Sequence, residues 1–123
     1  MKRTVKSIEE RKDFPAFFQK HCQIIKDNKL CCLECGAKLK GEVSEIAHVL
    51  PKQYFKSIAT DDRNVIYLCG MWSDNQCHSN FDGWPQEKVK QMNIFPKISS
   101  IFAELENEIK ENINYKTYDR YTS

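Results

Sequence analysis

The sequence predicts an α+β fold in which helical segments flank a central, cysteine-rich segment with short strands. Three observations predict it: apolar residues recur at helical spacing near both ends, β-prone residues gather in the middle, and five of the six cysteines lie there. With 123 residues, a single compact domain over 1–123 is the default. We expect an N-terminal helical part over 7–28, a core over 30–83 and C-terminal helices over 84–113.

The N-terminal part carries the signals of a helix with one buried face. Ser7 and Glu10 have the spacing of a capping box, which predicts a helix start near Ile8. Pro15 disfavours helical geometry in the residue before it, so we expect a break near Phe14. The apolar residues at helical spacing are Phe14, Phe17, Phe18, Cys22 and Ile25, and the helix is expected to end at Asp27-Asn28-Lys29. His21 lies beside this aromatic face and is expected to be structural.

Two β-prone runs lie in the central segment, over 43–49 and 65–68, with a loop of mixed charge and aromatic residues between them. The C-terminal part is mainly helical, and Pro96 stands where a first helical turn tolerates proline. Its apolar stripe consists of Ile98, Ile101, Phe102, Leu105, Ile109 and Ile113. This stripe fits packing inside a monomer, and a homodimer formed through it is the alternative.

Composition excludes several classes of protein. A hydrophobic content of 41% with 29% charged residues is typical of a globular domain rather than a disordered chain. There is no apolar run long enough for a membrane span and no secretory signal, so we expect a reducing cytoplasm. Disulfides are rare in that compartment, whereas metal sites are common. A net charge of +2 does not by itself indicate a nucleic-acid-binding protein.

The cysteines predict a structural zinc site. Cys32-Leu-Glu-Cys35 has the spacing that puts two thiolates on one side of a zinc ion, and Gly36 lets the backbone turn tightly behind them. Cys69 and Cys77 would complete a tetrahedral four-thiolate set, although their spacing is wider than usual. Four thiolates leave no open position for chemistry at the ion.

Other interpretations of the cysteines remain open. Cys69 or Cys77 could be a small buried hydrophobe, and Cys31, one residue out of phase, is interpreted as packing. Cys32 and Cys35 also have the spacing of a thiol redox pair, but the order of strands and helices around them is unlike thioredoxin.

Three further stretches carry histidine and asparagine. They are Glu45-Ile-Ala-His48-Val-Leu-Pro51, Arg63-Asn64-Val-Ile-Tyr-Leu-Cys69 and Gln76-Cys77-His78-Ser-Asn-Phe-Asp82. With the cysteine pairs, this ordered set resembles the HNH endonuclease family of ββα-metal nucleases, over about Cys32 to Asp82. The resemblance implies a zinc-bound ββα-metal (His-Me finger) core and places His48, Asn64 and His78 at the catalytic positions.

The resemblance implies metal-dependent hydrolysis of phosphodiester bonds in DNA. His48 would be the general base, because an imidazole titrates near neutrality, and Asn64 would bond the backbone or the imidazole and fix its orientation. His78 and Asp82 are four residues apart, so on a helix they share a face and could bind Mg²⁺, Mn²⁺ or Ni²⁺. Similar standalone domains occur in phage and mobile-element genomes, so the protein is expected in the host cytoplasm if it is phage-encoded.

One position departs from the family pattern. The residue before the general base often supplies a metal ligand, and here it is Ala47. Either His78, Asp82, water and substrate hold the metal, or another group contributes, or catalysis has been lost. The other candidate ligands are Glu45, Asp61, Asp62 and Asn80. The alternative function is a non-catalytic zinc-binding module for nucleic acid or a protein partner.

The remaining expectations concern basic and aromatic residues near these motifs. Lys52, Lys56 and Arg63 are the candidate phosphate contacts, because they are close in sequence to His48 and Asn64. Trp72 and Trp84 are interpreted as packing residues rather than as platforms for nucleobases.

Overall fold

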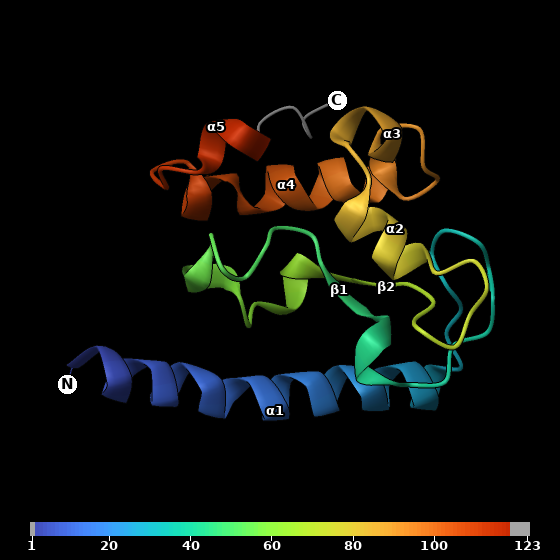
Figure 1. The fold of residues 1–123 in the computed structure, drawn as a ribbon, viewed down its shortest axis with the longest axis horizontal. Helices are drawn as coiled ribbons and strands as arrows, with labels where there is room; N and C mark the ends of the chain where they lie inside the picture. Colours follow the sequence, from blue (N-terminus) through green and yellow to red (C-terminus); the bar gives the residue numbers. More distant parts are fainter. Residues whose placement is uncertain (1, 119–123) are drawn as a thin grey trace.

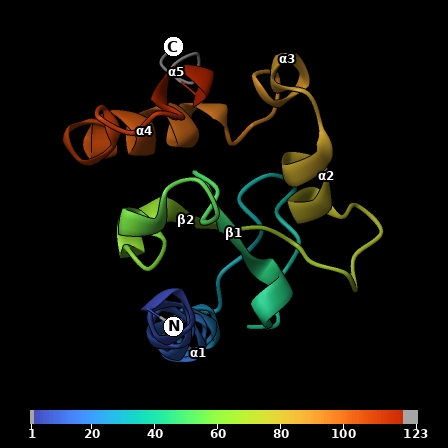
Figure 2. The same cartoon turned by 60° about the vertical axis from the view of Figure 1, so that its left-hand side comes forward.

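The computed structural model describes residues 2–118, except for the side chains of 2–13, 117 and 118. The longest helix, α1 (Lys2–Asn28), lies on one side of a small sheet, and the C-terminal helices lie on the other side (Figures 1 and 2). The strands are β1 (Ile46–His48) and β2 (Val65–Tyr67). The later helices are α2 (Cys77–Gly83), α3 (Gln86–Val89), α4 (Phe95–Ile109) and α5 (Tyr115–Tyr118). Short 3-10 helices lie at Val43–Glu45, Lys56–Ile58 and Asp62–Asn64.

Helix α1 is longer than predicted and continues through Pro15, so the expected start near Ile8 and the expected break at Phe14 are wrong. Pro15 removes one backbone hydrogen bond but does not forbid the helix. Beyond it, one helix face is buried against the sheet through Phe17, His21 and Ile25, and this burial stabilises the helical conformation. The predicted end is confirmed, since α1 stops at Asn28 and Lys29 has a left-handed backbone.

The two strands form an antiparallel pair, in which Ile46 faces Tyr67, Ala47 faces Ile66 and His48 faces Val65. Both predicted β-prone runs therefore supply a strand, although each strand is only three residues long. Such a short pair has little stability alone and depends on the helices that pack against it. The pairing brings the end of β1, with His48, close to the start of β2, which follows Asn64 directly.

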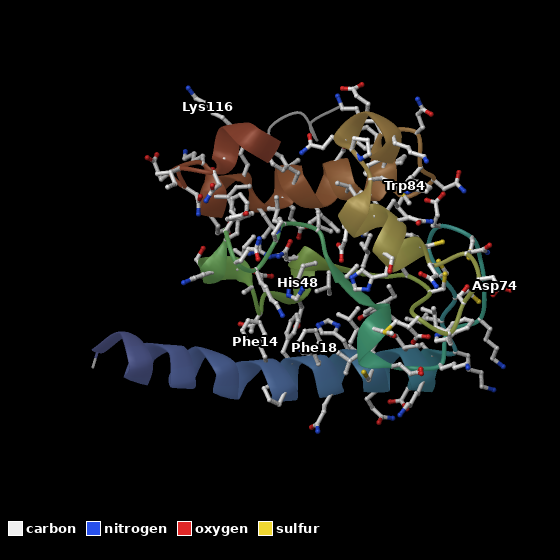
Figure 3. All side chains as sticks on the ribbon, in the orientation of Figure 1. Phe14, Phe18, His48, Asp74, Trp84 and Lys116 are labelled. Carbon is white, nitrogen blue, oxygen red and sulfur yellow. The ribbon has the colours of Figure 1, made fainter. Side chains whose placement is uncertain are left out.

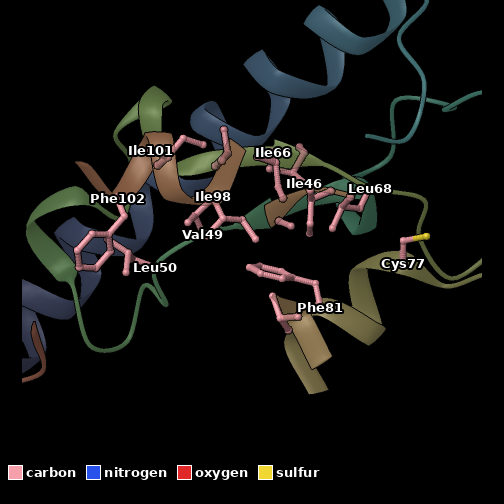
Figure 4. Packing of buried hydrophobic residues seen from close by; sticks show 14 of the residues in the cluster. Ile46, Val49, Leu50, Ile66, Leu68, Cys77, Phe81, Ile98, Ile101 and Phe102 are labelled. Atoms are coloured by element: carbon pink, nitrogen blue, oxygen red, sulfur yellow. The ribbon is translucent and has the colours of Figure 1, made fainter. Parts of the chain in front are cut away.

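The core lies between the sheet and α4, with Phe81 of α2 inserted beside it (Figure 4). Five of the six residues of the predicted C-terminal stripe are buried: Ile98, Ile101, Phe102, Leu105 and Ile109. Ile113 is 97% exposed, so its place in the stripe is wrong. Helix α4 ends at Ile109, and the following turn is held by the Asn112 side chain, which donates to the carbonyl of Tyr54 at 2.9 Å.

The predicted mixture of helices and a small sheet is confirmed. None of the helices in the described part of the chain is long and apolar enough to cross a membrane.

Candidate functional site

Four cysteine side chains converge at one end of the sheet. The sulfur atoms of Cys32, Cys35, Cys69 and Cys77 all lie within 4.8 Å of one another. A tetrahedral zinc–thiolate site, with zinc–sulfur bonds of about 2.3 Å, needs sulfur–sulfur separations of about 3.8 Å. The sulfurs of Cys35 and Cys69 are 3.9 Å apart. The cluster could therefore coordinate a metal ion such as zinc, and its members are the four cysteines predicted for that role.

A tight turn presents the first pair. The amide of Gly36 donates to the carbonyl of Cys32 at 2.9 Å, and the amide of Cys35 points at the Cys32 sulfur at 3.5 Å. Gly36 has φ +80°, a left-handed conformation that glycine adopts without strain. The amide of Leu33 donates to the carbonyl of Tyr67, so the turn is tied to the end of β2. Cys31 is exposed and outside the cluster, so its interpretation as a packing residue is wrong.

The second pair is brought together by a seven-residue excursion, 70–76. The amide of Cys77 lies 3.3 Å from the Cys69 sulfur, and the amide of His78 donates to the Cys69 carbonyl. The chain reverses at Gln76, whose φ is +42°. The wide spacing of this pair therefore closes in space, and it fixes the start of α2, where His78 is the second residue.

The thiols of the cluster differ in how easily they ionise. Burial raises the pKa of the Cys32 and Cys77 thiols. Burial also acts to raise the pKa of Cys35, but hydrogen bonds from the Asn75 side chain and the Ala37 backbone lower it to about 7. Four crowded sulfurs of which most are buried are costly as free thiolates, and a bound cation removes that cost. The donor set thus fits a thiolate-binding ion.

Glu45 organises the region beside the cluster, although sequence reasoning considered it only as a metal ligand. Its side chain is fully buried and accepts hydrogen bonds from the amides of Lys40, Gly41 and Glu42 at 2.7–2.9 Å. It also accepts one from the indole of Trp72 at 2.7 Å. These four hydrogen bonds occupy both carboxylate oxygens, which are the atoms that would bind a metal. Glu45 is therefore a structural link between the turn before β1 and the excursion at 70–76.

His48 has a defined tautomer. Its Nε2 atom lies 2.7 Å from the carbonyl oxygen of Ala59. A carbonyl only accepts, so Nε2 carries the proton and, in the neutral ring, Nδ1 carries the lone pair. Burial lowers the pKa of the His48 imidazole below its ordinary value, and the nearby Lys52 ammonium acts in the same direction. His48 is therefore oriented and is biased toward the neutral form, which is able to accept a proton.

His78 and Asp82 meet on one face of α2. The Nδ1 atom of His78 donates to the carbonyl of Ser44 at 2.6 Å, which leaves Nε2 directed at Oδ2 of Asp82, 3.1 Å away. Burial acts to lower the pKa of His78, but the Asp82 carboxylate and the hydrogen bond to the Ser44 carbonyl together outweigh this effect, and the net shift is upward. A nitrogen and a carboxylate oxygen this close, on adjacent turns of a helix, can share a proton or a divalent cation.

One pocket of about 530 Å³ joins these groups. His48, His78 and Asp82 all line it, and so do Lys52 and Phe18. Figure 3 shows His48 above the face of α1 that carries Phe14 and Phe18. The tertiary structure thus brings together the residues predicted as base and metal ligands, which are as far apart as 34 positions in the sequence. We call this space the histidine pocket.

Asn64 lies behind the pocket. Its buried side-chain oxygen accepts from the amide of Leu50 at 2.8 Å, and its side-chain nitrogen donates to the Leu50 carbonyl at 3.0 Å. A longer bond of 3.4 Å reaches the carbonyl of Ile58, the neighbour of Ala59. Asn64 therefore bonds the backbone of the loop that returns to His48 and does not bond the imidazole.

Ala47 has no exposed surface and faces Ile66 across the sheet. None of the four substitute ligands considered for it lines the histidine pocket. Glu45 is occupied as described, Asp61 pairs with Arg63, Asp62 bonds Lys20 and His21, and Asn80 bonds the carbonyl of Asn75. Of the residues predicted as ligands of the catalytic metal, His78 and Asp82 line this pocket, with an imidazole and a carboxylate respectively.

The three candidate phosphate contacts are placed differently. Lys52 lines the pocket, with its ammonium 5.0 Å and 5.5 Å from the ring centroids of Phe14 and Phe18. Lys56 is exposed in the loop between the strands. Arg63 is bound on both sides by Asp61 and Glu108, which raise the pKa of its guanidinium, and it does not line the pocket.

The two tryptophans pack as predicted. Trp72 and Trp84 are both partly buried against the core. Trp84 also lies beneath the ammonium of Lys88, which is 3.9 Å from the ring centroid.

We compared the chain with sequence profiles of known families, with characterised proteins and with solved structures, and found no match in any of the three.

Proposed function

We propose that this protein is a metal-dependent endonuclease that hydrolyses phosphodiester bonds in DNA, with a ββα-metal core of the HNH type. The order β1, β2, α2 along the chain supports this assignment, with His48 at the end of β1 and His78 at the start of α2. The cysteine cluster supports it as well, because its two halves flank the segment that carries His48 and Asn64.

The observation that carries the proposal is the hydrogen bond from His48 to Ala59. Because Nε2 donates to a backbone carbonyl, Nδ1 is left as the basic atom in a solvent-accessible pocket. Hydrolysis needs a base that takes a proton from the attacking water, and an oriented neutral imidazole suits this task. Asn64 contributes by holding the loop that supplies the Ala59 carbonyl.

A divalent cation fits the other side of the pocket. His78 Nε2 and Asp82 Oδ2 are both available as ligand atoms, since the opposite nitrogen of His78 is committed to the Ser44 carbonyl. Mg²⁺, Mn²⁺ or Ni²⁺ are candidates, and the ion would stabilise negative charge on the phosphate and the leaving oxygen. Two protein ligands leave the remaining positions to water and substrate.

We further propose that the cysteine cluster holds zinc in a structural role. All four protein ligands are thiolates, so such an ion has no open coordination position. It would fix the start of α2, and therefore His78, relative to the end of β2.

A cleavage assay tests the nuclease proposal. Supercoiled plasmid and circular single-stranded DNA are each incubated with the zinc-loaded protein and Mg²⁺, Mn²⁺ or Ni²⁺. His48→Ala is expected to lower the rate by a factor of about 10² to 10⁴, and added imidazole is expected to restore part of it. His21 offers a matched histidine outside the pocket, and His21→Gln is expected to keep the activity once its folding is confirmed.

Absence of cleavage by the wild-type protein on every substrate and metal, or equal rates for wild type and His48→Ala, would reject the proposed nuclease mechanism. Ala47 favours the second candidate, a zinc-binding module without catalysis, because its methyl group supplies no metal ligand and, of the predicted metal ligands, the pocket is lined by His78 and Asp82. DNA binding that persists without any cleavage would identify that module.

A further inference from the structure

Two phenylalanines of α1 lie at the histidine pocket, one lining it and the other stacked on the first. Phe18 lines the pocket, and its ring centroid lies 6.0 Å from that of His48, with the planes at 81°. Phe14 stacks on Phe18 at 6.1 Å with an angle of 26°. Both point from α1 to the side of the helix on which His48 lies (Figure 3). We call Phe14 and Phe18 the aromatic wall.

Core packing does not fully account for the aromatic wall. Phe17, between them in sequence, is 6% exposed and takes the buried place on the same helix. Phe14 and Phe18 are only half-buried, and Phe18 keeps ring surface open to the pocket. Proton transfer and metal binding need no aromatic surface, so the proposed chemistry gives the aromatic wall no role.

The wall already attracts a cation. The Lys52 ammonium lies 5.0 Å and 5.5 Å from the two ring centroids. Lys52 is exposed and its side chain is flexible, so this cation–π contact is weak and easily exchanged. Stacking of a nucleobase on an aromatic ring is stronger than an exposed contact of this kind. A base arriving at the wall therefore displaces the ammonium, which is then free to bind a phosphate of the same strand.

We propose that the histidine pocket takes single-stranded DNA, with one nucleobase stacked on Phe18 and the adjoining phosphate at His48. The inference rests on the proposed nuclease function for the role of His48. The ring centroids of Phe18 and His48 are 6.0 Å apart, so one nucleotide can reach both side chains. A volume of about 530 Å³ admits one nucleotide, and the wall continues into the apolar side chains of Val43, Ile46 and Pro51.

The preference for a single strand follows from stacking. Inside a duplex both faces of every base are covered by neighbouring base pairs, so no face is free for Phe18. A duplex would first have to unpair and unstack a base, which costs binding free energy. Lys52 adds affinity for the phosphates of either form, but it does not distinguish them.

A binding assay without added divalent metal tests the stacking separately from cleavage. Fluorescence anisotropy is measured for the full-length, zinc-loaded protein with a labelled DNA strand of about 12 nucleotides, its duplex, the matching RNA and an all-abasic strand. We expect the single strand to bind at least about tenfold more tightly than the duplex or the abasic strand. Phe18→Leu is expected to weaken single-strand binding about tenfold and leave duplex binding unchanged, whereas Phe18→Trp retains it.

Phe95→Leu is the matched control, because Phe95 is also half-buried but lies at the start of α4 and does not line the pocket. Thermal melting and zinc content confirm that each variant is folded. Equal affinity for single strand and duplex, an abasic strand bound as tightly as the normal one, or a Phe18→Leu effect no larger than that of Phe95→Leu would each overturn the proposal. Tighter binding of the RNA would overturn its assignment to DNA.

The two proposals fail in different ways. If single-strand binding depends on Phe18 but no substrate is cleaved, the nuclease is rejected and the stacking site stands. If duplex DNA is cleaved as fast as single-stranded DNA and Phe18→Leu changes neither rate, the nuclease stands and the stacking site is rejected.

Discussion

The buried carboxylate of Glu45 accepts the indole N–H of Trp72 at 2.7 Å, and this bond joins segments that are 27 residues apart. Glu45 directly precedes β1, and Trp72 lies in the excursion between Cys69 and Cys77. The Glu45 side chain therefore holds together two segments that are neighbours in space: the turn that leads into β1 and the loop that closes the cysteine cluster.

Glu45→Gln is expected to lower the free energy of unfolding by about 2–4 kcal/mol. Each carboxylate oxygen accepts two N–H groups, so an amide NH₂ in either position would face two donors. Denaturant unfolding of the zinc-loaded protein measures the change. Glu104→Gln, at an exposed position on α4, is the control and is expected to change the stability by less than about 0.5 kcal/mol. Similar values for the two variants would contradict the structural role of Glu45.

Cys35→Ser is expected to remove most of the bound zinc and to lower the melting temperature. The variant loses one of four converging sulfurs, and in a domain of this size the binding free energy of a structural metal contributes directly to folding. Elemental analysis and thermal melting measure both effects. Cys31→Ser is a closely matched control, because Cys31 is exposed and its sulfur is outside the cluster. A Cys35→Ser protein that is folded and retains its zinc would contradict a four-thiolate site.

The cleavage rate is expected to rise with pH through an inflection below about 6.5, the ordinary pKa of histidine. Burial lowers the pKa of His48, and only the neutral ring accepts a proton, so activity is lost as the pH falls below that lowered value. The measurement is the pH dependence of kcat/KM. Lys52→Met removes a positive charge that lowers this pKa, and the inflection should move upward. At a divalent metal concentration that saturates the site, so that His78 does not limit the rate, an inflection above the ordinary value, or none in this range, would exclude His48 as the titrating base.

Asn64→Ala is expected to destabilise the protein by about 2–4 kcal/mol, because it leaves the buried amide and carbonyl of Leu50 without their partner. Denaturant unfolding measures this loss. Asn93→Ala removes an exposed side chain with one bond to the carbonyl of Glu34, and its expected cost is below about 1 kcal/mol. A stable Asn64→Ala protein would show that the loop between the strands does not depend on this amide.

Ile109 and Ile113 test where the C-terminal stripe ends. Ile109→Ala is expected to cost about 2–5 kcal/mol, because the side chain is fully buried. Ile113→Ala is expected to cost less than about 0.5 kcal/mol, because the side chain is 97% exposed. Unfolding curves of the two variants provide the comparison. A large loss at Ile113 that depended on protein concentration would instead indicate a contact between copies of the chain.

Local sequence patterns predicted the elements well where the spacing of apolar residues itself determines which face of an element is buried. The spacing of Ile98, Ile101 and Leu105 predicts a helix with one buried face, and all three are buried. The pattern was wrong at its C-terminal end, where it included Ile113. An apolar side chain at that position does not show that the helix has already stopped at Ile109. The sequence pattern failed at Pro15 too, because a local preference was outweighed by burial further along the helix.

Some site residues could be predicted from the sequence and others could not, for a related reason. Ligand chemistry and spacing identified Cys32 and Cys35, and chemistry alone selected Cys69 and Cys77 despite their wide spacing. Three of the four donors to Glu45 are local, the amides of Lys40, Gly41 and Glu42, but the fourth is the indole of Trp72, 27 residues away, which only the folded chain brings to the carboxylate.

By itself, the sequence determined which atoms are available: four thiols, an imidazole before the long loop, and an imidazole and carboxylate one helical turn apart. Only the tertiary structure decided which nitrogen of His48 is basic, because the Ala59 carbonyl that settles it lies 11 residues away. It also decided that Phe18 borders the same pocket as His48, since α1 packs against β1. The residue type determines which reactions a side chain is capable of. Its hydrogen-bond partners and its neighbours from distant segments determine which of those reactions it can carry out in the folded protein.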